Sequence, residues 1–123
     1  MASAQQIRSA IQRYLDTVAT GTSADIAALY SDDATVEDPV GSPAHTGRAA
    51  IEKFYSALDS AQVATELLTV RVAGDSAAFG FRVTTGSGDR TTVIEPIDVM
   101  TFDEDARITS MRAFWSREDI TFG

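Results

Sequence analysis

Hydrophobic residues in the first half of the chain recur every three or four positions, which is the spacing of one face of a helix. The longest such segment covers residues 4–19, with a capping-box pair at Ser3 and Gln6 before it and Gly21 after it. Two shorter segments of the same kind, together with one brief strand between them, complete this half. The helices are predicted at residues 24–30 and 48–60 and the strand at residues 34–38, before Pro39.

The second half of the chain changes to segments that are typical of strands and are separated by turn residues. These segments cover residues 62–73, 76–85, 92–102 and 107–116. Gly74-Asp75 predicts a hairpin between the first two, and residues 86–89 predict a further turn. Helices followed by strands indicate an α+β fold, with three N-terminal helices packed on a strongly curved mixed or antiparallel sheet. Such a sheet, closed by helices, forms a cone that we expect to hold an apolar pocket.

Length and composition narrow the classes of function. With 123 residues, the chain is expected to form one domain over residues 1–123. Its net charge of −8 argues against sequence-independent binding to nucleic acid or to an anionic membrane surface. No apolar run approaches the roughly 20 residues that span a bilayer, and the N-terminus lacks the pattern of a secretory signal. A cytoplasmic location is therefore expected.

Few side chains in this sequence are chemically reactive. There is no cysteine and no glycine-rich phosphate-binding motif. The single histidine, His45, lies in a Gly/Pro/Ser-rich stretch that predicts a loop, where a solvated histidine is the simplest interpretation. One histidine cannot form a multi-histidine metal site, so no metal is expected. Any chemistry must then be carried by carboxylates and tyrosines.

One carboxylate stands on the apolar face of the predicted strand at residues 92–102. Alternation places Asp98 on the side of the strand that also carries Ile94, Pro96, Met100 and Phe102. An ionised carboxylate is costly to desolvate in such a place, and it usually responds by raising its pKa and staying protonated. A neutral carboxylic acid is a hydrogen-bond donor. An ordinary aspartate near a strand end, solvated or bonded to a backbone amide, fits the same pattern.

Five segments spread over most of the chain carry a resemblance to a known family. They are RYLDTVATG (13–21), ALYSDDATVEDPVG (28–41), GRAAIEKFY (47–55), GFRV (80–83) and PIDVMTFDEDARITSMRAFWS (96–116). Together they resemble the Δ5-3-ketosteroid isomerases, which have the cystatin-like, nuclear-transport-factor-2-like (SnoaL-like) cone fold. The runs YSDDATVEDPVG and IDVMTFDE are the most specific, whereas the others mark the superfamily.

The resemblance implies a role for each polar residue of the expected pocket. Asp38 matches the base that moves a proton, and Tyr14 and Asp98 match the two donors of an oxyanion hole. Tyr30 and Tyr55 match tyrosines that extend the hydrogen-bond network behind Tyr14. The implied reaction converts 3-oxo-Δ5-steroids to conjugated 3-oxo-Δ4-steroids through a dienolate, within steroid and lipid metabolism. No cofactor is expected. The implied partners are a steroid-like ligand and a second copy of the chain, bound through the outer face of the sheet.

Apolar residues that should face the pocket complete the predicted site. They come from the first and third helices and from the inward faces of the later strands. The predicted steroid contacts are Val18, Phe54, Leu58, Phe79, Phe81, Val83, Pro96, Met100, Met111, Ala113 and Trp115.

Two other functions fit the same fold. The first is a related enzyme, such as a polyketide cyclase or an epoxide hydrolase. An epoxide hydrolase of this type needs an arginine between two aspartates, and Arg82 and Arg112 fall on the strand faces opposite to Phe81 and Trp115. The second is a non-catalytic dimer that binds an apolar ligand. Such a binder leaves the coincidence of Asp38 with the proposed donors unexplained.

Overall fold

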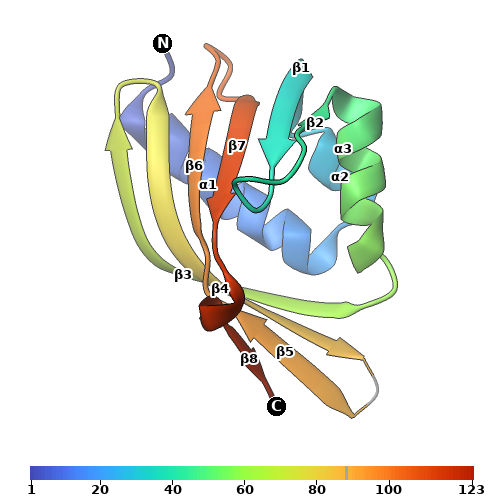
Figure 1. Ribbon diagram of the computed structural model, residues 1–123. Coiled ribbons are helices and arrows are strands. Elements are labelled where there is room, and N and C mark those ends of the chain that lie inside the picture. Colours follow the sequence, from blue (N-terminus) through green and yellow to red (C-terminus); the bar gives the residue numbers. More distant parts are fainter. Residues whose placement is uncertain (88) are drawn as a thin grey trace.

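The apolar faces of the helices are buried against a strongly curved sheet (Figure 1). The computed structural model describes residues 1–87 and 89–123. The predicted turn at residues 86–89 includes Gly88, which lies outside the described residues. None of the helices among the described residues is both long enough and apolar enough to cross a membrane.

The helices of the described chain lie in its first half, as predicted. They are α1 (Ala4–Thr20), α2 (Ser23–Ala27) and α3 (Arg48–Tyr55), which the 3-10 turn η1 (Ser56–Leu58) continues. The predicted capping box starts α1, because the Ser3 hydroxyl accepts from the Gln6 N–H at 3.1 Å and the Gln6 side chain accepts from the Ser3 N–H at 2.8 Å. The predicted second helix was three residues too long, since Tyr30 begins a strand and pairs with Ile108.

The strands form one mixed sheet. They are β1 (Tyr30–Glu37), β2 (His45–Thr46), β3 (Gln62–Ala73), β4 (Ser76–Ser87), β5 (Arg90–Ile94), β6 (Ile97–Phe102), β7 (Ile108–Phe114) and β8 (Ile120–Phe122), with the 3-10 turn η2 (Arg117–Asp119) before β8. Their order is β2-β1-β7-β6-β4-β5-β8, and β3 pairs with β4. The strands after α3 do not form a simple meander, because β4 pairs with β3, β5 and β6, and the early strand β1 runs parallel to β7. That parallel pairing brings the end of β1 beside the end of β7.

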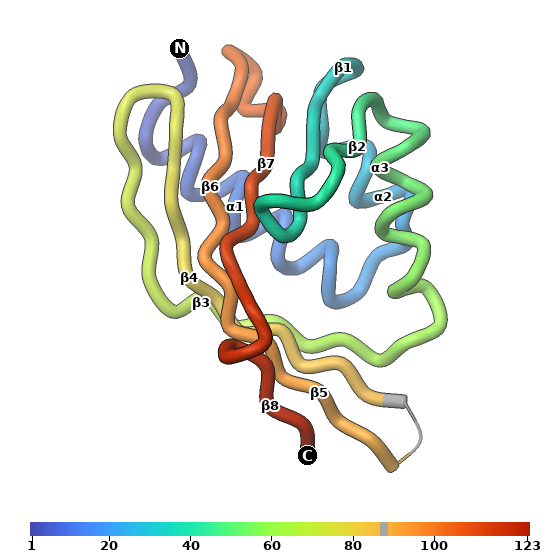
Figure 2. The backbone as a smooth tube through the Cα atoms, in the orientation of Figure 1, coloured from blue at the N-terminus to red at the C-terminus, as the bar shows by residue number. Residues whose placement is uncertain are grey.

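The sequence predicted one strand over residues 92–102, but Pro96 divides it into β5 and β6. Proline has no N–H to give to a ladder, so the pairing is interrupted there. Both pieces pair with β4, β6 along its first half and β5 along its second, and the Pro96 carbonyl accepts from the Phe81 N–H at 3.3 Å between them. Figure 2 shows β4 bending at this level, so that its second half runs with β5 toward the C-terminal strand β8.

The hydrophobic core fills the space between α1, α2, α3 and one face of the sheet. Its largest fully buried apolar side chains are Ile7, Ile11, Leu15, Ile26, Val36, Ile51, Phe79, Met100, Ile108 and Met111. Burial of each such side chain contributes about 1.5–3 kcal/mol relative to leaving it in water. The core thereby holds the helices at fixed positions over the curved sheet, around the cavity described next.

Candidate active site

A cavity of about 240 Å³ lies between the helices and the inner face of the sheet. Its lining comes from α1, from the residue after β1, from α3 and the turn after it, and from the strands β4 to β7 with their flanking residues. The lining residues are Tyr14, Val18, Asp38, Phe54, Tyr55, Ala57, Leu58, Phe81, Val83, Thr85, Thr92, Ile94, Pro96, Asp98, Ala113 and Trp115. Most of these side chains are apolar, so the cavity suits a largely apolar ligand.

Three of the predicted steroid contacts do not line the cavity. Phe79, Met100 and Met111 are at most 1% exposed and belong to the hydrophobic core. Alternation puts them correctly on the inner face of the sheet, but the helices cover that part of the face. Phe79 instead supports the cavity wall, with its ring centroid 5.3 Å from that of Phe81.

Four lining residues were not among the predicted contacts: Ala57, Thr85, Thr92 and Ile94. A signal for three of them was present in the sequence. Thr92 and Ile94 alternate in phase with Asp98, and Thr85 alternates in phase with Val83. Ala57 had no such signal, because it lies in the short 3-10 turn η1.

Asp98 lies on β6, opposite Ala113 of β7, with its side chain in the cavity wall. The residue is 1% exposed, and among the described residues its Oδ1 has no hydrogen-bond partner. Burial, and to a lesser degree the charge of Asp38, raise the pKa of Asp98 well above its usual range. Both causes favour the protonated form of Asp98, which is a neutral carboxylic acid.

Three tyrosines from three elements share a buried hydrogen-bond chain. The Tyr55 hydroxyl lies 2.9 Å from that of Tyr14 and 2.7 Å from that of Tyr30. Tyr55 at the end of α3 thus stands between Tyr14 of α1 and Tyr30 of β1. Burial is the largest cause that raises the pKa of each phenol well above its usual range. All three are neutral, and each added bond polarises the next along the chain.

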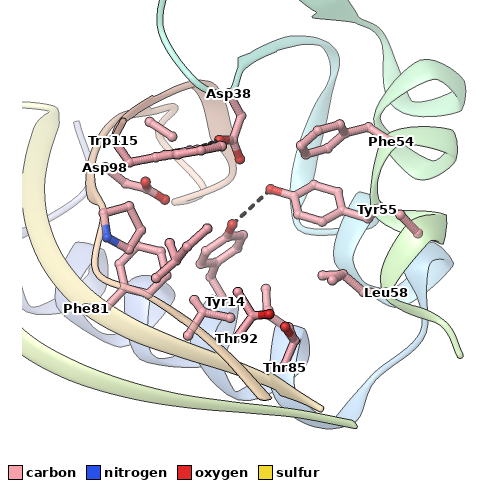
Figure 3. Close-up of a pocket in the computed structure, with 16 residues that line it drawn as sticks. Tyr14, Asp38, Phe54, Tyr55, Leu58, Phe81, Thr85, Thr92, Asp98 and Trp115 are labelled. Carbon is pink, nitrogen blue, oxygen red and sulfur yellow. Dashed lines mark hydrogen bonds between the residues drawn. The ribbon is translucent and has the colours of Figure 1, made fainter. Parts of the chain in front are cut away.

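Asp38 follows β1 directly and lies in the cavity lining beside Trp115 (Figure 3). The Trp115 Nε1–H donates to its Oδ1 at 2.6 Å, a contact that the sequence did not predict. Burial raises the pKa of the Asp38 carboxyl, while the Trp115 hydrogen bond and then the nearby His45 lower it. Opposing causes thus act on Asp38, whereas those on Asp98 all favour the protonated form.

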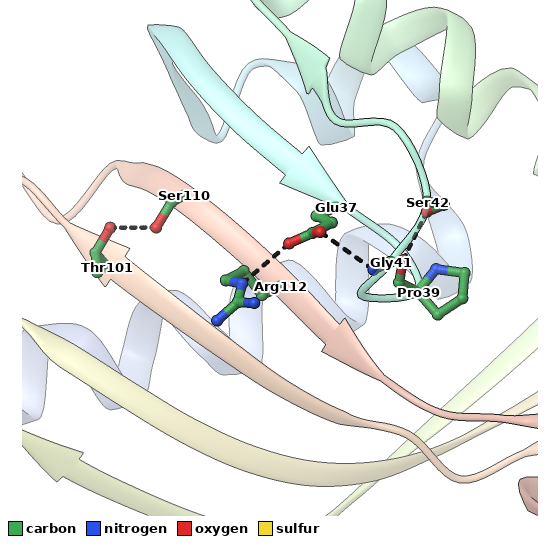
Figure 4. A network of polar contacts seen from close by, with 7 residues as sticks. All are labelled: Glu37, Pro39, Gly41, Ser42, Thr101, Ser110 and Arg112. Carbon is green, nitrogen blue, oxygen red and sulfur yellow. Dashed lines mark hydrogen bonds and ion pairs between the residues drawn. The ribbon is translucent and has the colours of Figure 1, made fainter.

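Hydrogen bonds hold the turn that carries Asp38 in place on both sides of this residue (Figure 4). Before it, the Glu37 carboxylate accepts from Arg112 Nε at 3.0 Å and from the Gly41 N–H at 3.2 Å. After it, the Ser42 hydroxyl donates to the Pro39 carbonyl at 2.6 Å. These hydrogen bonds restrict the movement of the backbone that carries the Asp38 carboxylate. A general base requires such fixed positioning.

His45 was expected to be a solvated loop residue, but the structure places it in the short strand β2. Its ring is half-buried and lies 4.7 Å between centroids from Phe54, a cavity residue. The pairing of β2 with β1, which holds Val36 opposite His45, brings the ring to this place. The sequence alone showed only the Gly/Pro/Ser-rich segment around it.

Asp38, Asp98 and Tyr14 direct their polar groups into one shared space (Figure 3). One of the three is Asp38, whose pKa is raised by burial, an effect that the Trp115 hydrogen bond opposes. The raised pKa values of the other two favour neutral donors. Such a set can remove a proton from a carbon atom and stabilise the oxyanion that forms next to it.

Cations are absent from the described part of the cavity lining. Arg82 pairs with Glu66 and Glu95, and Arg112 pairs with Glu37, all outside the cavity. Within residues 1–87 and 89–123, no group of three or more His, Asp or Glu side chains is arranged to hold a metal ion. The absence of metal and cofactor from the reaction stays a prediction.

Comparison with known proteins gives matches at the level of sequence and of fold. The family model of the SnoaL-like domain matches residues 11–111. A curated relative, the steroid Delta-isomerase of Nocardioides simplex, is 61% identical over 115 residues, which cover 94% of each chain.

Two solved structures superpose over the full length of both chains. SalBIII, an epoxide hydrolase/cyclase-like enzyme with a role in pyran ring formation in the polyether salinomycin, gives a TM-score of 0.92 at 27% identity. The protein RV0760c of Mycobacterium tuberculosis gives a TM-score of 0.89 at 20% identity. The second of these likenesses concerns the fold alone.

Proposed function

This chain belongs to the SnoaL-like domain family, and on that premise we propose that it is a steroid Δ-isomerase. It converts 3-oxo-Δ5-steroids to conjugated 3-oxo-Δ4-steroids, and the relative from Nocardioides simplex carries the name of that activity. The observation that supports the assignment most strongly is the shared apolar cavity, in which Asp38 faces two neutral donors, Tyr14 and Asp98.

The reaction begins at the Asp38 carboxylate. This base removes a proton from the carbon between the carbonyl group and the isolated double bond. The electron pair of the broken C–H bond moves toward the carbonyl, so a dienolate forms with its negative charge on the oxygen. Asp38 then returns the proton to the far end of the dienolate, and the double bond ends in conjugation with the ketone. One residue gives and takes the same proton, so no water or external acid is consumed.

The two donors act at the carbonyl oxygen. Tyr14 and protonated Asp98 donate hydrogen bonds that strengthen as negative charge develops there. The surrounding wall is apolar, so these bonds act with little screening by water. Ketosteroid isomerases are themselves the established example of a carboxylic acid that an apolar site keeps protonated at pH 7. The raised pKa of Asp98 agrees with that pattern.

The tyrosine chain supports the donors from behind. The Tyr30 hydroxyl can donate to that of Tyr55, and Tyr55 can donate to Tyr14, which leaves the Tyr14 proton for the substrate. This arrangement lets the Tyr14 hydroxyl accept one bond while it donates another. Each link then increases the strength of the next.

A related enzyme of the same fold is the second candidate, since SalBIII is epoxide hydrolase/cyclase-like. An epoxide hydrolase that relies on an arginine between two aspartates needs this arginine at the reacting centre. Within the described lining there is no arginine, and Arg82 and Arg112 are paired with glutamates elsewhere. The cavity therefore favours the isomerase.

The direct test mixes the protein with a 3-oxo-Δ5-steroid and follows the ultraviolet absorbance of the conjugated enone. Rapid growth of this band over the buffer control is expected. A rate equal to that of buffer, from protein whose circular dichroism shows it to be folded, would exclude the isomerase.

Replacement of Trp115 by Phe is expected to shift the pH dependence of turnover. The variant loses the Nε1–H bond that lowers the pKa of Asp38, so that pKa rises. Because only the ionised carboxylate acts as a base, activity is present above this pKa and lost below it. The acidic limb of kcat/KM should therefore move to higher pH, which a series of initial rates across pH measures. An unchanged limb would show that Trp115 does not tune Asp38.

A homodimer and a cytoplasmic location are the remaining parts of the proposal. The outer sheet face exposes Ile97 and Phe114 at opposite positions of β6 and β7, where they are 52% and 43% exposed. Exposed apolar side chains on neighbouring strands are typical of an interaction surface. A monomer mass in light scattering would contradict the dimer.

A further inference from the structure

We propose that the cavity contains a second polar site, the threonine pair Thr85 and Thr92, which binds an oxygen atom at the end of the steroid furthest from its reacting ketone. The proposal rests on the isomerase function, because it adds a specificity site to the same cavity. It selects steroids with a ketone or hydroxyl on the distal ring over steroids without one.

Strand β4 pairs with β6 and then with β5, and together these pairs form one ladder of opposite residues. Asp98 lies at one end of this ladder and the two threonines lie at the other. Every second pair of the ladder turns to the same face of the sheet. The pairs are Phe79 with Asp98, Phe81 with Pro96, Val83 with Ile94, and Thr85 with Thr92. From Pro96 onward, both members of each pair line the cavity.

The chemistry of the ladder changes along its length. Its two middle pairs are apolar, and it ends in two hydroxyl groups directly opposite each other. Figure 3 shows Thr85 and Thr92 on the side of the cavity away from Asp38, Asp98 and Trp115. A polar pair at this place interrupts an otherwise apolar wall, which a purely hydrophobic ligand would not require.

The threonine hydroxyls are available to a ligand. Some strand threonines use theirs within the protein, as Thr65 does with the Leu15 carbonyl at 2.9 Å and Thr101 with Ser110 at 2.6 Å. For Thr85 and Thr92 no such bond is found among the residues that the structure describes. A hydroxyl both donates and accepts, so this pair can bind either a ketone or an alcohol.

The distance along the ladder requires a long ligand. Asp98 follows Thr92 by six positions, which is about 20 Å along a fully extended strand. The break at Pro96 makes the straight distance shorter than this limit. A rigid steroid nucleus that carries one oxygen at each end can place its ketone at Tyr14 and Asp98 and its other oxygen near the threonines.

The test measures ligand binding, so it does not depend on turnover. The ligands are two 3-oxo-Δ4-steroids, one with a 17-ketone and one without. Trp115, the sole tryptophan of the chain, lines the cavity, so its fluorescence reports occupancy. In the double variant T85V/T92V, the Kd of the 17-ketone should rise about threefold to tenfold, with no change for the 17-deoxy steroid.

Two further variants separate a hydroxyl effect from a change of shape. T85S/T92S keeps both hydroxyls and should keep the preference for the 17-ketone. Thr84→Val is the matched control, because Thr84 is on the same strand outside the cavity lining, and it should leave both Kd values unchanged.

The outcomes bear separately on the two proposals. If T85V/T92V weakens both steroids equally, or weakens neither, the threonine site is excluded. If the native protein prefers the 17-ketone through these hydroxyls but does not form the conjugated enone, the threonine site stands and the isomerase function fails. Absence of binding by both steroids overturns the two together.

Discussion

Replacement of Asp38 by Asn should abolish steroid isomerisation while ligand binding persists. The carboxamide has nearly the shape of the carboxylate but cannot take a proton from carbon. General bases of this kind contribute about 10²–10⁴-fold to a rate, so kcat should fall by at least that range. Initial rates of enone formation measure the loss.

Binding in the same variant shows whether the site remains intact. A phenol that mimics the dienolate, such as equilenin, should still bind to D38N, because Tyr14 and Asp98 are unchanged and a carboxylate has been removed from the same cavity. The matched control is Asp33→Asn, which neutralises an exposed carboxylate on β1 without touching the cavity. Near-native turnover in D38N, or an equal loss in D33N, would refute the assignment of Asp38 as the base.

Replacement of Asp98 by Leu should have the second-largest effect, lowering kcat by about 10²–10³-fold. Loss of one oxyanion donor costs about 2.7–4 kcal/mol of transition-state stabilisation in other enzymes. Leucine fills a similar space but donates no hydrogen bond. Asp98→Asn keeps a neutral donor and should therefore retain more activity than D98L. Equal activity of D98L and the native protein would make Asp98 a purely structural residue.

Replacement of Asp98 by Leu should also stabilise the fold near neutral pH. Since burial raises the pKa of Asp98, the folded protein binds a proton there more tightly than the unfolded chain does. The contribution of Asp98 to stability is therefore highest below the usual pKa range of aspartate and is lost as pH rises toward the raised pKa. D98L removes this loss together with a buried oxygen that lacks a partner among the described residues. The Tm advantage of D98L over the native protein should grow from about pH 4 to about pH 7.

Opposite signs for activity and stability would separate function from structure at this position. If Asp98 served only packing, its substitution would lower both activity and stability. If it serves catalysis at the expense of stability, its substitution should lower activity and raise stability. Thermal melts and initial rates on one preparation supply both values.

The burial of Asp98 shows what the alternation of side chains along a strand can predict. Period two along residues 92–102 placed the carboxylate on the inner face of the sheet, and the structure finds it 1% exposed. The same rule placed Phe79, Met100 and Met111 correctly inward but not in the cavity. Alternation fixes only the side of the sheet, whereas the cover by helices decides which inward residues border empty space.

Contacts between distant segments were beyond any local pattern. The bond from Trp115 to Asp38 joins residues 77 positions apart. It depends on the parallel pairing of β1 with β7. These strands are far apart in the sequence, so no turn motif between them indicates that they pair. The Tyr14–Tyr55–Tyr30 chain depends in the same way on how two helices and one strand are packed.

For two residues, tertiary structure overrode the secondary structure that the local sequence predicted. Tyr30 continued the helical spacing of the second helix, but the pairing of β1 with β7 draws it into a strand. His45 looked like a loop residue and became part of a two-residue strand beside Phe54. Neighbouring strands offered these backbone groups hydrogen bonds that the local sequence could not reveal.

The sequence alone was enough to establish the order of the helices and of the longer strand segments, the inward side of those strands and the short set of reactive side chains, because these follow from local periodicity and composition. Tertiary structure decided that Asp38, Tyr14 and Asp98 face one cavity, that Trp115 donates to Asp38, and that Thr85 and Thr92 end the same wall. The physical reason is that pKa, burial and hydrogen bonding depend on neighbours in space, and those neighbours are set by strand pairing and sheet curvature.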